Sequence, residues 1–494
     1  MSTRTTTRTT LPRLRPYQCE AFRAIADSVL RRRGLTFTVE IARQGGKNEL
    51  SAQVELLLLV RHAATDTDAI KCAPTFRPQL RISMRRLWMR LAQSGLAGAA
   101  RQSENTIALG GAREIFLSAE PAANVVGHTA SLLLEVDEAQ DVDQEKFDRE
   151  FRPMAATTNA TTVMYGTAWD DRTLLERAKQ HNLELERRDG IRRHFEYDWQ
   201  SVAAHLPAYA TYVQAERARL GETHPLFLTQ YCLKTIAGGG RLFTAAQRAQ
   251  LAGDHDRQHG PVSAETYVAG LDLAGGDESV AALEESPGRQ PAPPSPDDHA
   301  ASSHRGSSTH DATVLTIGRL AYPPASAFVQ EPRVEIVEHY AWTGEPHEAL
   351  LPQIIDLLRG VWKVARVAVD ATGLGETAAR LIAQALGAAR VDAVKFTAAS
   401  KSQLGFDLLA AVNGGRLKTY RGDGSPEHRE FARQCDLARA AYRANSTLNF
   451  FVDPADGHAG GHDGGHDDYL VSAALLVHAS RDQHRRLATG RVRL

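Results

Sequence analysis

The feature that most constrains this chain is the stretch from residue 36 to residue 58. Thr36 to Ile41 is a run rich in β-branched residues, which predicts a buried strand. The pair Gly45-Gly46 and then Lys47 follow directly, and the apolar positions from Leu50 to Leu58 predict a helix. The stretch therefore predicts a strand, a glycine-rich turn and a helix in immediate succession.

This order of elements suits a loop that binds polyphosphate. Gly45 and Gly46 let backbone N–H groups approach the phosphates, the helix N-terminus adds its positive dipole, and Lys47 supplies a point charge. Two positions depart from the G-x-x-x-x-G-K-[ST] pattern, because Ile41 stands at the first glycine and Asn48 replaces the residue that binds magnesium. A Gly-Gly-Lys segment between a strand and a helix is also a common tight turn.

A second stretch favours the phosphate-loop interpretation. Ser131 to Val136 is an apolar run that predicts a buried strand, and Asp137 and Glu138 follow it. In nucleotide hydrolases a strand of this kind carries one carboxylate that holds magnesium and another that orients the attacking water. We assign these roles to Asp137 and Glu138, although an apolar strand with an acidic end is common. Both stretches in this order predict an ATPase.

Composition and length limit the alternatives. A chain of 494 residues exceeds one ordinary domain, so we expect two or three. No apolar run approaches the roughly 18–20 residues of a membrane span. The net charge of -1 neither supports nor excludes a nucleic-acid partner. The four cysteines are widely spaced, which is typical of a reducing compartment rather than of a disulfide framework.

The first half alternates predicted strands and helices. This alternation predicts an α/β domain with a doubly wound, mostly parallel sheet, which binds its ligand at the carboxyl ends of the strands. Tyr17 and Gln18, at the start of a helix ahead of the first strand, could hold an adenine by stacking and by the amide edge, or could simply pack. The arginine-rich helix from Pro78 to Leu96 could face DNA or solvent.

The second half restarts after a glycine-rich break. We expect a flexible arm at residues 1–13, a first domain at 14–237, a linker at 238–262 and a second domain at 263–494. Residues 284–310 have almost no aliphatic side chains, so we expect a disordered insertion. The second domain has a predicted β-β-β-α-β order.

Aspartates stand at the ends of these second-half elements. Asp272 ends the first predicted strand and Asp370 the fourth, and Asp467 and Asp468 precede an apolar helix. Oxygen ligands suit Mg²⁺ or Mn²⁺, and two such ions can clamp the oxygens of a phosphodiester during cleavage. Strand-end and helix-cap aspartates are also common structural features. The arrangement favours an RNase H-like nuclease, with Asp468 preferred over Asp467 as the last ligand because it stands at the entry of the helix.

With both halves considered, the chain resembles the large terminase subunit of tailed bacteriophages. The resemblance extends from about Leu14 to His478 and rests on the joint pattern, since each piece alone is weak. The pieces are Arg15-Pro16-Tyr17-Gln18, Ala42 to Glu49, Leu134 to Gln140, Tyr165 to Ala168, Gly270-Leu271-Asp272, Val369 to Gly373 and Gly465 to Asp468.

This resemblance implies further roles and partners. It implies an Arg-Gln-x-Gly-Lys form of the phosphate loop, Arg43 as an arginine finger or phosphate contact, and Gly166-Thr167 as the segment that couples hydrolysis to movement. It also implies ATP and Mg²⁺ (or Mn²⁺) as cofactors and double-stranded DNA, a portal protein, a small terminase subunit and further copies of the chain as partners. The implied setting is the cytoplasm of an infected bacterial host, with no membrane association.

Two other classes remain open. A helicase or restriction-type DNA translocase with an appended nuclease would use similar residues, but further helicase motifs are not evident after Asp137 and Glu138. A capsid-associated scaffold with decayed sites is the non-enzymatic alternative, and the presence of Lys47, Glu138 and the three separated aspartate positions argues against it.

Overall fold

The computed structural model describes residues 13–237, 239–274, 312–324, 326–373, 375–443, 446–452, 466–481 and 483. The chain forms two compact units. The first comprises Met1–Arg217, Glu222–Gly238 and Tyr442–Ser446, and the second comprises Ala218–Gly221, Gly239–Ala441 and Thr447–Leu494. The predicted arm, except for Arg13, and the predicted insertion at 284–310 lie outside the described residues.

The first unit is built on an eight-stranded sheet with the order β3-β4-β5-β2-β6-β7-β1-β8. Its strands are β1 (Thr36–Ile41), β2 (Thr67–Ala73), β3 (Ala100–Gln102), β4 (Thr106–Leu109), β5 (Ala112–Ser118), β6 (Leu133–Val136), β7 (Thr161–Gly166) and β8 (His194–Tyr197). β5, β2, β6, β7, β1 and β8 pair in parallel, each with the next. The pairs β3–β4 and β4–β5 are antiparallel. The prediction of a mostly parallel α/β sheet is confirmed.

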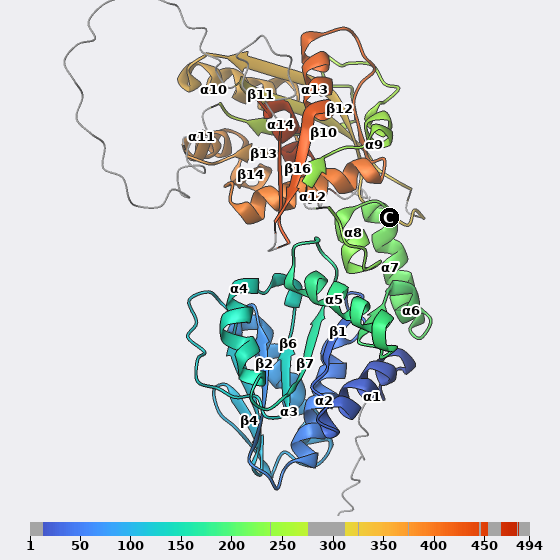
Figure 1. The fold of residues 1–494 in the computed structure, drawn as a ribbon. Coiled ribbons are helices and arrows are strands. Elements are labelled where there is room, and N and C mark those ends of the chain that lie inside the picture. Colours follow the sequence, from blue (N-terminus) through green and yellow to red (C-terminus); the bar gives the residue numbers. More distant parts are fainter. Residues whose placement is uncertain are drawn as a thin grey trace, which may run out of the picture. The chain divides into compact units, whose positions relative to one another are not determined.

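Helices cover both faces of this sheet (Figure 1). The helices before residue 231 are α1 (Pro16–Leu30), α2 (Lys47–Arg61), α3 (Arg81–Gln93), α4 (Gln144–Lys146), α5 (Leu174–Asp189), α6 (Trp199–Ala203), α7 (Pro207–Leu220) and α8 (Pro225–Gln230). Neighbouring side chains of β5 separate the two faces. Phe116 packs with α2 and α3, whereas Ile115 and Leu117 pack with the start of α5. Successive side chains of a strand point to opposite faces, so α2–α3 and α5 lie on opposite sides.

The second unit has a six-stranded sheet with the order β14-β13-β10-β11-β12-β15. Its strands are β10 (Thr266–Asp272), β11 (Ala312–Ala321), β12 (Arg333–Thr343), β13 (Arg366–Asp370), β14 (Val391–Val394) and β15 (Leu417–Lys418). β10, β11 and β12 pair antiparallel in succession, and β13 then pairs in parallel with β10. This is the predicted RNase H-like arrangement.

A small second sheet and further helices belong to this unit. The sheet has the order β17-β16-β9, with β9 at Gly239–Arg241, β16 at Ala438–Tyr442 and β17 at Leu448–Val452. The helices are α9 (Ala245–Leu251), α10 (His347–Asp356), α11 (Gly375–Leu386), α12 (Ala398–Asn413), α13 (Pro426–Leu437) and α14 (Asp468–Ala479).

The apolar helix α14 lies against β10 at a glycine. A Cβ on Gly270 would stand 2.1 Å from the backbone oxygen of Ser472 and 2.4 Å from the nitrogen of Leu476. The Ser472 hydroxyl also donates to the Gly270 carbonyl over 2.9 Å. The other face of β10 packs with α10 and α11 through Tyr267, Ala269 and Leu271. The absence of a side chain at Gly270 therefore sets how closely the start of α14 approaches Asp272.

Four ionisable side chains lie buried between α2 and the first sheet. Lys71 of β2, Glu114 of β5 and Glu135 of β6 come from neighbouring strands, and Glu55 comes from α2; none is more than 1% exposed. The Lys71 ammonium lies 2.8 Å from Glu55 and 3.8 Å from Glu135. Ser51 of α2 donates to Glu135, so the cluster ties the helix that begins at Lys47 to β6.

This cluster holds three carboxyl groups and a single ammonium among its four ionisable members. Both oxygens of Glu114 are buried without a hydrogen-bond partner among the described residues. Burial raises the pKa of Glu114 well above its ordinary value, and the nearby Glu55 and Glu135 raise it further. Both effects favour the protonated form of Glu114.

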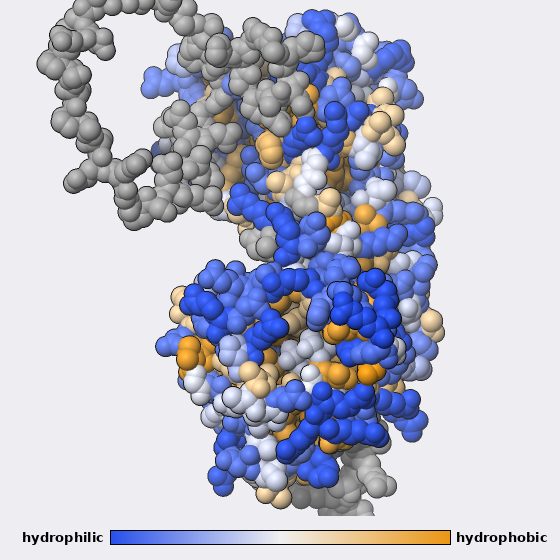
Figure 2. All heavy atoms as spheres, viewed as in Figure 1, coloured by the Kyte–Doolittle hydropathy of each residue, from blue (hydrophilic) through white to orange (hydrophobic). Residues whose placement is uncertain are grey.

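Hydrophilic side chains dominate the face shown in Figure 2, where apolar ones occur in small separate groups. Among the described residues, no helix is long and apolar enough to cross a membrane.

The contact at Gly270 predicts a stability loss on substitution. We expect Gly270→Ala to lower the unfolding free energy of the second unit by about 1–3 kcal/mol, because two backbone atoms of α14 must move away. Chemical denaturation followed by circular dichroism measures this. Gly260→Ala is the matched control, since its Cβ meets nothing within 4 Å. Equal stability of the two variants would contradict the close approach of α14.

The buried Glu114 predicts a pH-dependent difference. A pKa raised in the folded state contributes stability below the unfolded pKa of about 4.5, and this contribution is lost as the pH rises toward the folded pKa. The variant Glu114→Gln does not titrate. The unfolding free energy of this variant, relative to that of the wild type, should therefore become more favourable as the pH rises above about 4.5. Glu145→Gln, at an exposed position, is the control. A difference that stays constant with pH would mean that folding does not raise the pKa of Glu114.

Candidate functional site

A cavity of about 710 Å³ lies at the carboxyl end of β1 in the first unit. Among the predicted site residues, it is lined by Gln18, Arg43, Gly45, Gly46, Lys47, Asn48, Glu138 and Thr167. These come from α1, the loop after β1, the segment after β6 and the segment after β7. Because β6, β7 and β1 are parallel neighbours, their carboxyl ends bring these separate stretches to one edge.

The loop after β1 needs its glycines. Gly46 has φ 97°, in the left-handed region, and a Cβ there would meet the Gln18 amide nitrogen at 2.6 Å. A Cβ on Gly45 would meet Ile41 at 2.5 Å and the Ala42 carbonyl at 2.7 Å. Gly46 is the N-cap of α2, and Gly46, Lys47 and Asn48 all line the cavity, so the N-terminus of α2 lies at its wall.

Tyr17 and Gln18 hold this loop from α1. The Tyr17 hydroxyl donates to the Gly45 carbonyl over 2.6 Å, and the Gln18 amide donates to the Gly46 carbonyl over 2.8 Å. Tyr17 is buried and packs against Tyr197 of β8, with ring centroids 5.2 Å apart. Gln18 lines the cavity, whereas Tyr17 is not among the described residues that line it.

Lys47 is paired with the two predicted catalytic-site carboxylates. Its ammonium lies 2.7 Å from Glu138 and 3.7 Å from Asp137. Burial would lower the pKa of Lys47, but Glu138 and Asp137 outweigh this and raise it. Burial would likewise raise the pKa of Glu138, but the Lys47 charge and hydrogen bond lower it below its ordinary value. Both groups are therefore charged at neutral pH.

Among the described residues, basic side chains outnumber acidic ones in the cavity lining: Arg13, Arg15, Arg43, Lys47, Arg86 and Arg90 against Glu49, Glu138 and Asp141. Arg43 reaches the Gln230 side chain over 2.5 Å. Arg86 and Arg90, on the predicted basic helix, lie 3.3 and 3.1 Å from Glu49, whereas Arg81 and Arg85 of the same helix are exposed. The excess of basic groups suits a polyanion.

Gln140 is a site residue that the sequence analysis did not single out. Its amide nitrogen donates to Glu138 over 2.9 Å, and its amide oxygen accepts from the Thr167 backbone N–H over 3.3 Å. It therefore connects Glu138 with the segment after β7. Its position two residues after Glu138 was the one available signal.

The predicted aspartates of the second unit lie on adjacent elements. β10 and β13 pair in parallel through Leu271 and Val369, so Asp272 and Asp370 follow at neighbouring strand ends. Asp468 is the first residue of α14, and its carboxylate accepts from the Ala312 backbone N–H of β11 over 3.0 Å.

Further contacts orient these aspartates. Asp370 accepts from the Thr372 backbone N–H over 2.8 Å. The Asp467 carboxylate lies 3.8 Å from the Lys401 ammonium. All four aspartates are less than 10% exposed.

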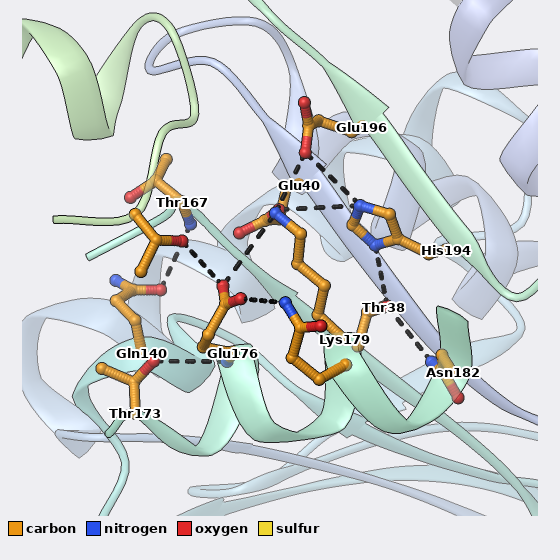
Figure 3. A network of polar contacts seen from close by, with 12 residues as sticks. Thr38, Glu40, Gln140, Thr167, Thr173, Glu176, Lys179, Asn182, His194 and Glu196 are labelled. Atoms are coloured by element: carbon orange, nitrogen blue, oxygen red, sulfur yellow. Dashed lines mark hydrogen bonds and ion pairs between the residues drawn. The ribbon is translucent and has the colours of Figure 1, made fainter. Parts of the chain in front are cut away.

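Two groups of three possible metal ligands have all their ligand atoms within 4.8 Å of one another in the described part of the chain. They are Glu55–Glu114–Glu135 and Glu40–His194–Glu196, both in the first unit. Each group includes glutamates paired with a lysine: in the second group, Lys179 lies 2.7 Å from Glu40 and 3.0 Å from Glu196 (Figure 3). These lysines already supply the positive charge that a metal ion would bring.

Comparisons with known proteins show which solved structures have a similar fold. No protein-family model matches the chain, and no curated protein sequence is significantly similar to it. Among solved structures, the large terminase from a thermophilic bacteriophage is similar at a TM-score of 0.54 and 11% identity, over 94% of this chain and 98% of that one. The structures of the same terminase in complex with ADP and with ATP-γ-S give TM-scores of 0.53 and 0.50 at 10% and 11% identity, with the same coverage. Over nearly its whole described length, this chain has the fold of a bacteriophage large terminase.

Proposed function

We propose that the chain is the ATP-driven motor of a viral DNA-packaging machine, with a metal-dependent nuclease in its second unit. The observation that carries the proposal is the convergence of Gly45, Gly46, Lys47 and Glu138 on one cavity with a surplus of basic side chains. The terminase from the thermophilic bacteriophage, which has the same fold, binds ADP and ATP-γ-S.

The cavity suits the phosphates of ATP. The glycine turn and the N-terminus of α2 offer backbone N–H groups, and Lys47 supplies the charge. Asp137, with Asn48 or a water molecule, would hold Mg²⁺, which offsets the negative charge of the phosphates. Arg43 lines the same cavity and would contact the phosphates.

Glu138 is the group suited to the attacking water. The Lys47 charge lowers the pKa of Glu138, so the side chain is a carboxylate that can orient the water through a hydrogen bond. In this structure one Glu138 oxygen pairs with Lys47. A polyphosphate competes for the same ammonium, and its arrival would release that oxygen for water. Binding of ATP and activation of Glu138 are thus linked through Lys47.

The second unit suits cleavage of a phosphodiester. Asp272, Asp370 and Asp468, with Asp467 nearby in sequence, offer oxygen ligands that Mg²⁺ or Mn²⁺ prefers. Bound ions would stabilise the charge on the oxygens of the scissile phosphate.

The same proposal names the partners. Double-stranded DNA would be held by its phosphates without base readout, through exposed basic side chains such as Arg81 and Arg85. A portal protein, a small terminase subunit and further copies of this chain would complete the machine in the host cytoplasm, and the nuclease would cut concatemeric genomes.

Substitutions in the first unit test the ATPase. We expect Lys47→Ala and Glu138→Gln to reduce the kcat for ATP hydrolysis by about 100-fold or more, because each removes a charge that acts on the phosphates or the water. Glu138→Gln should still bind ATP-γ-S. Phosphate release from purified protein measures the effect, and Lys234→Ala, at an exposed position outside the cavity lining, is the control. Near wild-type turnover in either variant would remove that residue from the mechanism.

Substitutions in the second unit test the nuclease separately. Asp272→Asn and Asp370→Asn should abolish nicking of plasmid DNA with Mg²⁺ or Mn²⁺ and leave ATP hydrolysis intact, because each removes a metal ligand. We expect Asp468→Asn to behave like them. Nicking that survives in Asp468→Asn but is lost in Asp467→Asn would assign the last ligand to Asp467. Joint loss of both activities, with a lowered melting temperature, would indicate misfolding instead.

A further inference from the structure

Gln140 lies between two parts of the nucleotide site that are far apart in the chain. It belongs to a short 3₁₀ turn, Ala139–Asp141, and is only 6% exposed. Its amide nitrogen donates to Glu138 over 2.9 Å and to Asp141 over 3.0 Å. Its amide oxygen accepts from the Thr167 backbone over 3.3 Å, a contact drawn in Figure 3. The donor end thus faces the acidic segment and the acceptor end faces the segment after β7.

The two oxygens of Glu138 have different partners. Oε1 pairs with the Lys47 ammonium over 2.7 Å, and Oε2 accepts from Gln140. When phosphates take the Lys47 charge, Oε1 becomes available to water while Gln140 still holds Oε2. Glu138 also has a left-handed backbone, with φ 50°. A side-chain contact that fixes the carboxylate therefore complements an already constrained backbone.

The end of β7 lies against the same Gln140 amide. A Cβ on Gly166 would stand 2.3 Å from the Gln140 amide oxygen and 2.5 Å from the Leu175 side chain, so only a glycine lets the strand approach both residues this closely. The contact with Thr167 follows one residue later. A displacement of this glutamine would therefore change the contacts of both Glu138 and the backbone after β7.

We propose that Gln140 is a positioning residue for ATP hydrolysis, which orients Glu138 toward the attacking water and links it to the backbone at Thr167. This inference rests on the proposed ATPase function. The role requires an amide, because one end must donate to a carboxylate and the other must accept from a backbone N–H. A glutamate at this position keeps the acceptor and loses the donor, and a methionine loses both.

The experiment compares Gln140→Met and Gln140→Glu with the wild type. Loss of a hydrogen bond to a charged group predicts a fall in kcat of about tenfold or more in both variants. The KM for ATP and the affinity for ATP-γ-S should stay within about twofold, because Gln140 acts on the water-side carboxylate rather than on the phosphates. Gln180→Met is the control: Gln180 donates to Glu176 over 2.6 Å, the same kind of contact outside the cavity lining.

A double-mutant cycle separates positioning from packing. Gly166→Ala should lower kcat by displacing the Gln140 amide. In a Gln140→Ala background, where that amide is absent, the same substitution should cost several-fold less, because only its contact with Leu175 remains. Additive losses in the cycle would contradict the link to β7. Wild-type kcat in Gln140→Met, or a loss of nucleotide affinity as large as the loss of kcat, would overturn the positioning role. Failure of the wild type itself to hydrolyse ATP would instead overturn the proposed function.

Discussion

The ion pair between Lys47 and Glu138 is the interaction on which the account of the first unit depends. Lys47 on the phosphate-loop helix and Glu138 after β6 have side chains that are 11% and 30% exposed, so both are partly shielded from water. Each supplies a charge opposite to that of the other, and partial shielding strengthens their attraction. Their meeting requires the carboxyl ends of β1 and β6 to lie at one edge, with β7 between them. The pair is also an exchangeable contact. A polyphosphate is the kind of ligand that can take the lysine and leave the glutamate free to act.

The buried cluster of Lys71, Glu55 and Glu135 holds α2 against the sheet. Lys71 faces Glu55 and Glu135, and Ser51 joins them, so the helix that starts at Lys47 is held against the strand that leads to Glu138. Removing one partner from such a buried group typically costs about 3–5 kcal/mol. The cluster thus ties the stability of the sheet to the relative position of the two halves of the nucleotide site. Tyr165, one residue before Gly166, donates to Glu135 over 2.8 Å and brings β7 into the same group.

The helices and strands could be predicted from the sequence more completely than the contacts between them. The apolar runs that precede Asp137, Asp272 and Asp370, and the run that ends at Ile41, predicted strands of both sheets. A buried strand has a local signature, and the polar residues after it mark the ligand edge. The sequence did not reveal that Tyr17 hydrogen-bonds the Gly45 carbonyl from behind the loop, since that depends on where α1 packs.

The buried ionisable residues are visible in the sequence, but local patterns do not show which residues they pair with. Lys71 and Glu135 each stand inside an apolar strand, which indicates a paired charge, but the partners come from strands and a helix far apart in sequence. The antiparallel strands β3 and β4, short and partly exposed, were also absent from the predicted elements. Both the partners of the buried charges and the pairing of β3 and β4 depend on contacts between residues that are distant in the sequence.

The central claim is that Lys47 exchanges a carboxylate for phosphate when nucleotide binds. A crystal structure of the full chain with ATP-γ-S and Mg²⁺ tests it most directly. The account predicts phosphates against Gly45, Gly46 and the N-terminus of α2, with the Lys47 ammonium moved from Glu138 to a phosphate oxygen and Gln140 still bonded to Glu138. Nucleotide bound away from this loop, or bound in it with the Lys47–Glu138 pair intact, would contradict the account.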